Sequence, residues 1–262
     1  MGIYLLFVFC AWNLCYHEFF TRADISTGLV AHYTFDGNTN DSSGNNNHGT
    51  AVGNPTYVTG QIGQALSFDG TDDDVEMGDP ADGSLDFGTG NFSISTWIKQ
   101  DPVQVNDGGL GVVWKGANTS PDAGYNLFYE ADLDKVTCGV SDTGTRVITV
   151  SNTTISDDVL VHVVTVTNRD NDTCNIYLNG VLDKSGDISA VTGSVDNTNA
   201  FRVGANAFTG SGEFTGDIDD VRIYNRALTA ADITELYNLG ATGEEHIKVR
   251  GGGSSAAGVK VR

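Results

Sequence analysis

Oxygen-bearing side chains are concentrated in two distant segments of this chain. The first, HYTFDGNTNDSSGNNNHG, runs from His32 to Gly49, and the second, GDIDDVRIYNRALTAADITELYNLG, runs from Gly216 to Gly240. Asp36, Asn38 and Asn40 alternate along the first segment, and alternate residues of a tight loop can converge on one point. Carboxylate and amide oxygens are the ligands that hard cations such as Ca²⁺ prefer. The spacing therefore indicates a cation-binding loop.

This loop is not an EF-hand. Asp41 occupies the sixth position, where the turn needs Gly, and Asn47 occupies the twelfth, where a bidentate Glu is needed. Because Ca²⁺ takes roughly six to eight oxygens, the loop must recruit a second segment, and Asp219 and Asp220 are the expected remote donors. Strand alternation predicts that these two point to opposite faces. The alternative is an Asx-rich turn that only caps its own backbone.

Short strands are the elements that would position these residues. The chain has 33 Gly against 4 Pro, and Gly, Asn and Asp tolerate the backbone of tight turns. Apolar and polar residues alternate in many of the expected strands, which are residues 29–35, 64–68, 74–77, 92–99, 111–115, 125–130, 135–141, 145–150, 160–168, 174–178, 200–203 and 216–224. One helix is expected from Thr229, with Ile233, Leu236 and Tyr237 at helical spacing. The pattern predicts an all-β sandwich of two sheets.

Composition narrows the classes of function. The 262 residues include 39% hydrophobic residues, enough for a sizeable core. The formal net charge of −20 would repel a polyphosphate over most of the surface, so nucleic-acid binding is excluded. The same charge fits solubility and the binding of cations.

The four cysteines fall into two pairs. Cys10 and Cys15 lie in an apolar N-terminal stretch, whereas Cys138 and Cys174 lie in expected strands, where alternation points them inward. A disulfide between Cys138 and Cys174 is expected if the two strands are neighbours. Two buried free thiols are the alternative.

The chain ends differ in composition from the body. Residues 1–27 form an apolar segment that we interpret as a signal peptide; a retained strand or a docking arm is the alternative. The apolar run is too short to predict a membrane span. Residues 28–240 form the expected domain, and residues 241–262 form a basic tail that contains Gly and Ser. The tail is expected to be a frayed end, a join to a further downstream module, or a segment that pairs with neighbouring molecules.

Five asparagines begin Asn-X-Ser/Thr triplets, which accept N-linked glycans if the chain enters a glycosylating pathway. They are Asn40, Asn91, Asn118, Asn152 and Asn171.

Five separated motifs resemble one known family. They are HYTFDGNTNDSSGNNNHGT, GQIGQALSFDGTDDDVEMG, NFSISTWIK, LVHVVTVTNRDNDTCNIYLNGVL and GDIDDVRIYNRALTAADITELY. In this order they resemble the laminin-G-like jelly-roll domain of the concanavalin A-like lectin/glucanase superfamily, from about Gly28 to Gly240. The resemblance implies an antiparallel jelly-roll sandwich with its first and last strands side by side and one short C-terminal helix. It also implies a calcium site built from Asp36, Asn38, Asp41 and an Asp of the 218–220 motif.

Catalysis is not expected. The superfamily includes retaining glycosidases, whose two carboxyl groups lie on one strand face roughly 5 Å apart. Glu130, Asp132 and Asp134 have the alternating spacing, but the surrounding sequence predicts a hairpin with its tip at residues 132–135. His162 is a catalytic-base alternative for which the sequence specifies no carboxylate partner.

Aromatic residues give a weak indication of a sugar site. Trp97 and Trp114 lie in expected strands and are predicted to be core residues, whereas Tyr57, Tyr125 and Phe208 are candidate loop aromatics. Sugar rings stack on such side chains.

The sequence thus predicts a secreted or cell-surface, calcium-stabilised binding or adhesion module for a glycan or an extracellular protein. Two alternatives remain. One is a structural subunit of a filament or sheath that self-associates through its N-terminal arm and C-terminal tail, and the other is a glycoside hydrolase.

Overall fold

A computed structural model describes residues 24–102, 109–116, 122–206 and 212–242. The segments that the self-association alternative depends on, residues 1–23 and 243–262, lie outside the described residues, as do Cys10, Cys15, Asn118 and Phe208. Within the described residues no helix has the length and apolar character needed to cross a membrane.

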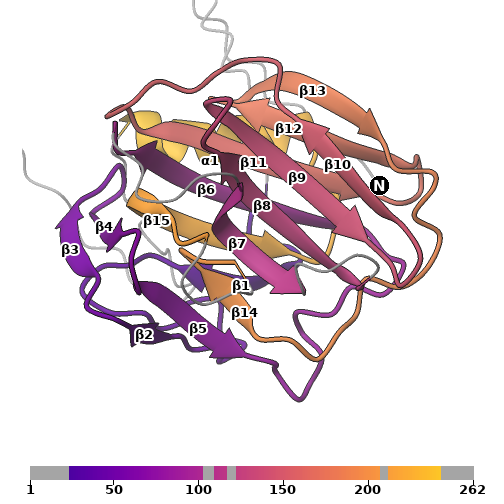
Figure 1. The fold of residues 1–262 in the computed structure, drawn as a ribbon, viewed down its shortest axis with the longest axis horizontal. Helices are drawn as coiled ribbons and strands as arrows, with labels where there is room; N and C mark the ends of the chain where they lie inside the picture. The colour runs from indigo at the N-terminus through magenta and orange to yellow at the C-terminus, as the bar shows by residue number, and fades with distance from the viewer. Residues whose placement is uncertain (1–23, 103–108, 117–121, 207–211, 243–262) are drawn as a thin grey trace, which may run out of the picture.

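Two antiparallel sheets face each other (Figure 1). Sheet A has the order β13-β12-β11-β6-β15-β4-β3, and β1 also pairs with β15. Its strands are β1 (Leu29–Tyr33), β3 (Thr56–Thr59), β4 (Gln64–Asp69), β6 (Phe92–Gln100), β11 (Val161–Asn168), β12 (Thr173–Leu178), β13 (Val181–Asp187) and β15 (Thr215–Tyr224). The first and last strands of the sandwich therefore lie side by side, as predicted.

Sheet B has the order β10-β9-β8-β7-β14-β5-β2. Its strands are β2 (Thr50–Val52), β5 (Asp74–Gly78), β7 (Gly109–Gly116), β8 (Gly124–Glu130), β9 (Lys135–Ser141), β10 (Arg146–Val150) and β14 (Phe201–Val203). The predicted all-β jelly-roll sandwich with one C-terminal helix is confirmed.

The inward side chains of both sheets form one large apolar core. Alternation along β8 shows the principle, because Tyr125, Leu127 and Tyr129 all belong to this core. Tyr125 is 1% exposed, so its prediction as a loop aromatic was wrong: it lies within a strand on the inward face. Tyr57 lies on the edge strand β3 and is exposed.

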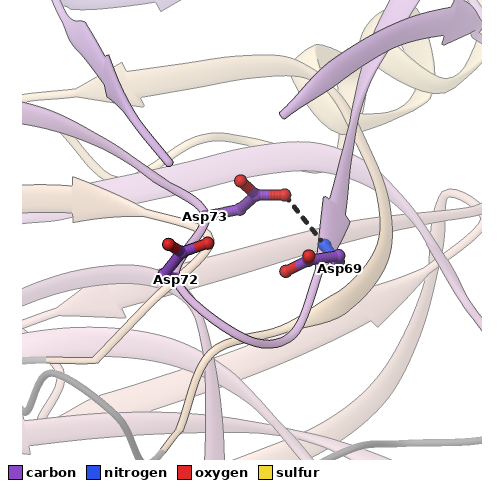
Figure 2. A group of neighbouring side chains, drawn as sticks. All are labelled: Asp69, Asp72 and Asp73. Carbon is purple, nitrogen blue, oxygen red and sulfur yellow. Dashed lines mark hydrogen bonds between the residues drawn. The ribbon is translucent and has the colours of Figure 1, made fainter. Parts of the chain in front are cut away.

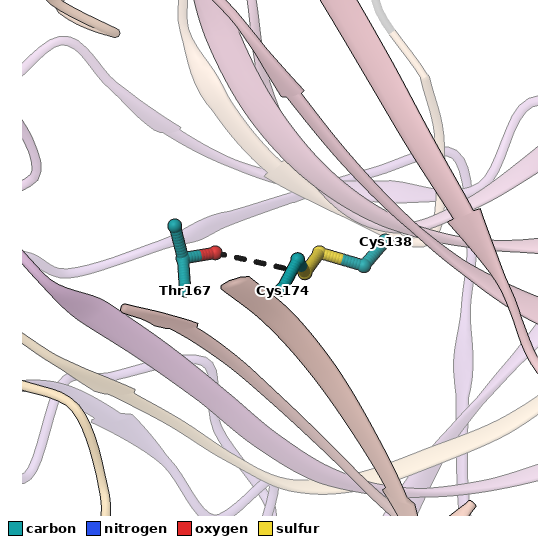
Figure 3. Close-up of a disulfide and its surroundings, with 3 residues drawn as sticks. All are labelled: Cys138, Thr167 and Cys174. Carbon is teal, nitrogen blue, oxygen red and sulfur yellow. Dashed lines mark hydrogen bonds between the residues drawn. A yellow bond between two sulfur atoms is a disulfide. The ribbon is translucent and has the colours of Figure 1, made fainter. Parts of the chain in front are cut away.

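A disulfide crosses the core between the sheets (Figure 3). Cys138 of β9 and Cys174 of β12 form it, with Cα atoms 7.0 Å apart. The two strands are not hydrogen-bonded neighbours; they face each other from opposite sheets. The disulfide therefore links the two layers of the sandwich.

The one helix of the described residues, α1 (Ala230–Thr242), packs on the outer face of sheet A. It begins with a capping box, because the Asp232 backbone N–H donates to Thr229 Oγ1 and the Thr229 backbone N–H donates to Asp232 Oδ2. Ile233, Leu236 and Leu239 then pack with Val164 and Val166 in a second apolar cluster. Strand β11 of sheet A is thus buried on both faces.

Candidate functional site

The two acidic segments meet, but they do not form one set of five ligands. The segments come together because β1 and the loop after it lie beside β15. Within β15 a bulge separates Asp219 from Arg222, and Asp220 has a positive φ of 50°. Ile218 and Val221 both belong to the core, so two residues stand between them instead of one. The predicted alternation of Asp219 and Asp220 was therefore wrong: neither points into the core, and they have different partners on the outer side.

Asp220 belongs to a buried ion-pair network. Arg222 Nε donates to Asp220 Oδ2 at 2.9 Å, and Arg222 Nη2 donates to Asp220 Oδ1 at 3.0 Å. His32 Nε2 lies 2.6 Å from Asp220 Oδ1. Burial alone would raise the pKa of Asp220, but Arg222 and His32 outweigh it and hold that pKa well below its usual range. The charge of Asp220 is thus balanced by protein groups.

Asp41 caps its own loop. Its Oδ1 accepts the backbone N–H groups of His32 and Ser43, and its Oδ2 accepts the Ser43 hydroxyl and the Asn47 N–H. This arrangement is the Asx-turn alternative given by the sequence. Asn38 also shapes the loop, because its Oδ1 accepts the Asn40 N–H and its Nδ2 donates to the Asp36 carbonyl.

Asp36 and Asp219 are anchored on the same short loop between β3 and β4. Asp219 Oδ2 accepts the backbone N–H groups of Gln61 and Ile62, each at 2.8 Å. Asp36 Oδ1 accepts the Gln64 N–H at 2.8 Å. Glycines make this close approach possible, since a Cβ on Gly63 would lie 2.2 Å from Asp36 Oδ1.

The second carboxylate oxygen of Asp219 shows whether the surroundings of Asp219 and Asp36 suit a bound cation. Asp219 is fully buried, and its Oδ1 has no hydrogen-bond partner in the structure. Burial raises the pKa of Asp219 from 3.8 to about 7, and the charges of Asp220 and Asp36 add to this rise. A buried carboxylate with an unpartnered oxygen beside a second carboxylate is an environment that a cation would stabilise. Asp36 and Asp219 therefore fit a metal ion, whereas the carboxylates of Asp41 and Asp220 are satisfied by protein groups.

A third acidic group was missed by sequence reasoning (Figure 2). Asp69, Asp72 and Asp73 surround the β4–β5 turn, with ligand atoms within 4.8 Å of one another. Asp73 accepts the backbone N–H groups of Asn54 and Asp69. The signal was the Asp run at residues 72–74, which the sequence analysis used only as part of a family motif.

His162 is a core residue without the geometry of a catalytic base. It is 1% exposed, and its ring lies 5.0 Å from the Trp97 ring and 6.1 Å from the Tyr237 ring. Burial lowers the pKa of His162 from 6.5 to about 3. The imidazole is therefore neutral and sealed beneath α1.

The carboxylates with glycosidase-like spacing in the sequence do not share one strand in the structure. Glu130 ends β8, and residues 131–134 form the turn to β9. Asp134 has a positive φ of 53° and accepts the Tyr129 hydroxyl. Alternation along one strand therefore does not carry Glu130, Asp132 and Asp134 onto one face.

Four of the predicted glycosylation sites are described. Asn40, Asn152 and Asn171 are exposed, whereas Asn91 is half-buried. The side chain of Asn91 accepts the Arg169 N–H and donates to Asp170, so a glycan on its Nδ2 would compete with the hydrogen bond to Asp170.

The fold defines the class of protein as a jelly-roll module, and comparison with known proteins identifies the family. A family model described as the concanavalin A-like lectin/glucanases superfamily, of the laminin G type, matches residues 69–234. The chain therefore belongs to this laminin-G-like family. Over 163 residues the chain is 29% identical to the adhesion G-protein coupled receptor V1 of Danio rerio. The aligned region covers 60% of this chain and 2% of that protein.

Solved structures show the same fold. The binding domain of Paraclostridial Mosquitocidal Protein 1 matches with a TM-score of 0.68 and 19% identity over 82% of this chain and 53% of that one. Domain 4 of AbnA, an extracellular arabinanase of Geobacillus stearothermophilus solved with arabinotriose, has a TM-score of 0.60 and 23% identity over 80% of this chain and 98% of that one. The receptor-binding domain of a botulinum neurotoxin C/D mosaic has a TM-score of 0.66 and 16% identity, with 82% and 52% covered. Membership of the family supports a carbohydrate- or protein-binding module, and the solved structures, all under 25% identical, show the shared fold.

Proposed function

We propose that this chain is an extracellular, calcium-stabilised module that binds carbohydrate and catalyses no reaction. One observation carries the proposal: the match to AbnA domain 4 covers 98% of that domain, which was solved with an oligosaccharide bound. The whole sandwich therefore corresponds to a unit of similar size whose ligand is a sugar. A protein ligand is the second possibility within the same class, because other neighbours are toxin binding domains.

An oxidising compartment fits this proposal. The Cys138–Cys174 disulfide lies in the core, with both cysteines at most 2% exposed. Disulfides form and persist outside the reducing cytosol. An exported module is also consistent with the acidic composition, which keeps the surface soluble.

Calcium would be held by Asp36 and Asp219. These carboxylates hold the 61–64 loop through three backbone N–H groups, and the unpartnered Asp219 oxygen remains for a cation. When bound, the ion would neutralise the repulsion between the two carboxylates. Its role would be structural, since it would fasten the loop after β3 to the last strand of the sandwich.

A glycan array tests the proposal directly. The purified protein should bind a defined set of glycans in calcium. Because the ion would act on stability, Asp219→Asn should bind the same glycans when folded but melt at a lower temperature in calcium than wild type, whereas the exposed control Asp132→Asn should melt like wild type. Failure to bind any glycan, together with specific capture of one extracellular protein, would replace carbohydrate by a protein ligand.

A further inference from the structure

The outer face of sheet B carries a row of side chains that points away from the core. Trp114 of β7 pairs with Asn126 of β8, Asn126 pairs with Gly139 of β9, and Gly139 pairs with Ile148 of β10. Because the neighbours of Asn126 in β8 are core residues, this row faces outward. No helix or strand in the described part of the chain covers it.

An aromatic pair lies on this face. The rings of Trp114 and Phe128 have centroids 5.9 Å apart, and neither residue belongs to the two apolar clusters of the sandwich. The burial predicted for Trp114 is confirmed, at 3% exposed, and the ring lies on the outer side of sheet B. Its indole N–H donates to the Gly116 carbonyl at 2.9 Å, which fixes the ring on the face.

Arg146 covers the Trp114 ring. Its guanidinium carbon lies 5.8 Å from the ring centroid, in a cation–π contact. Arg146 starts from the edge strand β10, and β9 and β8 lie between it and β7. Since neighbouring strands are about 4.8 Å apart, the two side chains must together span the row above Gly139 and Asn126. The long Arg146 side chain therefore lies over one part of the aromatic ring.

Two buried oxygens beside this pair have no partner. Asn126 Oδ1 and Thr137 Oγ1 are both buried and form no hydrogen bond with any described residue. Asn126 is 7% exposed and Thr137 is 0% exposed. Gly139 makes room for the Asn126 amide, because a Cβ there would lie 2.2 Å from Asn126 Oδ1. A buried oxygen without a hydrogen-bond partner destabilises the fold, so a ligand that supplies hydroxyl donors would recover this cost.

We propose that the outer face of sheet B is the carbohydrate-binding site. A sugar ring stacks on Trp114 in place of the Arg146 guanidinium, and its hydroxyls donate to Asn126 Oδ1 and Thr137 Oγ1. This assignment rests on the proposed function, since it names the surface at which the module would bind carbohydrate. A carbohydrate fits because it combines an apolar ring face with hydroxyl donors, and the face offers one aromatic ring beside two acceptors.

Opposite effects of two substitutions test the site. The probe is arabinotriose together with a panel of neutral oligosaccharides, and binding is measured by calorimetry on the full chain in calcium. Thr137→Val should weaken binding about three- to tenfold, as expected for one lost hydrogen bond. Arg146→Ala should strengthen binding, because it uncovers the ring without removing an acceptor. Trp97→Phe, on the other sheet, is the matched control for Trp114→Phe.

The outcomes separate the site from the function. Weaker binding by Thr137→Val and Asn126→Ala, with stronger binding by Arg146→Ala, supports the assignment. Wild-type affinity in all three variants would overturn the site while the proposed function stands. If the wild-type chain binds no sugar of the panel, both the site and the carbohydrate function are overturned. Melting curves of each variant show whether a loss of binding is a loss of folding.

Discussion

The outer faces of the two sheets differ in what covers them. On sheet A the chain supplies its own cover, because Leu236 and Ile233 of α1 pack on Val164 and Val166. On sheet B the described residues supply no helix, and the Trp114 ring contacts Phe128 and Arg146. A sandwich gives each sheet two sides, and here α1 covers the outer side of sheet A, whereas no described helix or strand covers the outer side of sheet B. The difference shows which face is built for stability and which is left for a partner.

Removing the cover of sheet A should have the largest effect. Leu236→Ala deletes a side chain that is 1% exposed at the helix–sheet contact. Such a truncation costs about 2–5 kcal/mol, which chemical denaturation would measure. Carbohydrate affinity of the folded variant should stay at the wild-type value. A loss below about 1 kcal/mol would mean that the helix does not seal this face.

Calcium should have the next largest effect, also on sheet A. At a free calcium concentration of 100 times Kd the ion should stabilise the fold by about 2.7 kcal/mol, visible as a higher melting temperature than in EDTA. Asp36→Ala and Asp219→Asn should remove most of this response, whereas Asp132→Asn should keep it. If metal-free wild-type protein has the same melting temperature with and without added calcium, the proposal of a calcium site is wrong.

Acid should loosen the sealed face through His162. Its pKa is about 3 in the folded chain, against 6.5 for an ordinary histidine, so the unfolded chain binds the proton more readily. Stability is therefore complete above pH 6.5 and is lost as pH falls toward 3. Between pH 6.5 and 5 the loss from this one group is about 2 kcal/mol. His162→Gln should flatten the pH dependence relative to wild type over this range; parallel curves for the two proteins would contradict the explanation.

The smallest effect on stability should come from sheet B. Thr137→Val removes a buried hydroxyl that has no partner, so the free energy of unfolding should stay the same or rise by up to about 1 kcal/mol. The same substitution should weaken carbohydrate binding. A clear loss of stability would show that the Thr137 hydroxyl has a structural role. It would contradict the proposal that this hydroxyl is available to a ligand.

Sequence periodicity predicted the buried strands and the edge strand β10, and failed at the other three edges. β9 begins and ends where alternation predicted, because it packs on the core at one face. β2, β3 and β13 were missed because they are short or exposed edge strands without a regular apolar stripe. Burial of an alternating face is the physical source of the pattern, and these strands have little of it.

The site was predicted only in part, for similar reasons. The types of Asp36 and Asp219 indicated a cation, but the bulge at Asp220 depends on tertiary pairing that no local pattern reveals. Trp114 was expected in the core because a strand sequence does not tell which face a buried aromatic occupies. The neighbouring roles of Asn126 and Thr137 arise only when β8 and β9 pair.

The most direct test compares the two tryptophans in one experiment. Trp97 lies beneath α1 on sheet A, and Trp114 lies on the outer face of sheet B. Their indole N–H signals can be followed by NMR as oligosaccharide is added in calcium, with Trp97→Phe and Trp114→Phe assigning them. We predict that the Trp114 signal shifts in proportion to binding while the Trp97 signal stays in place. A shift of Trp97 with an unchanged Trp114, or no shift of either, would contradict the account.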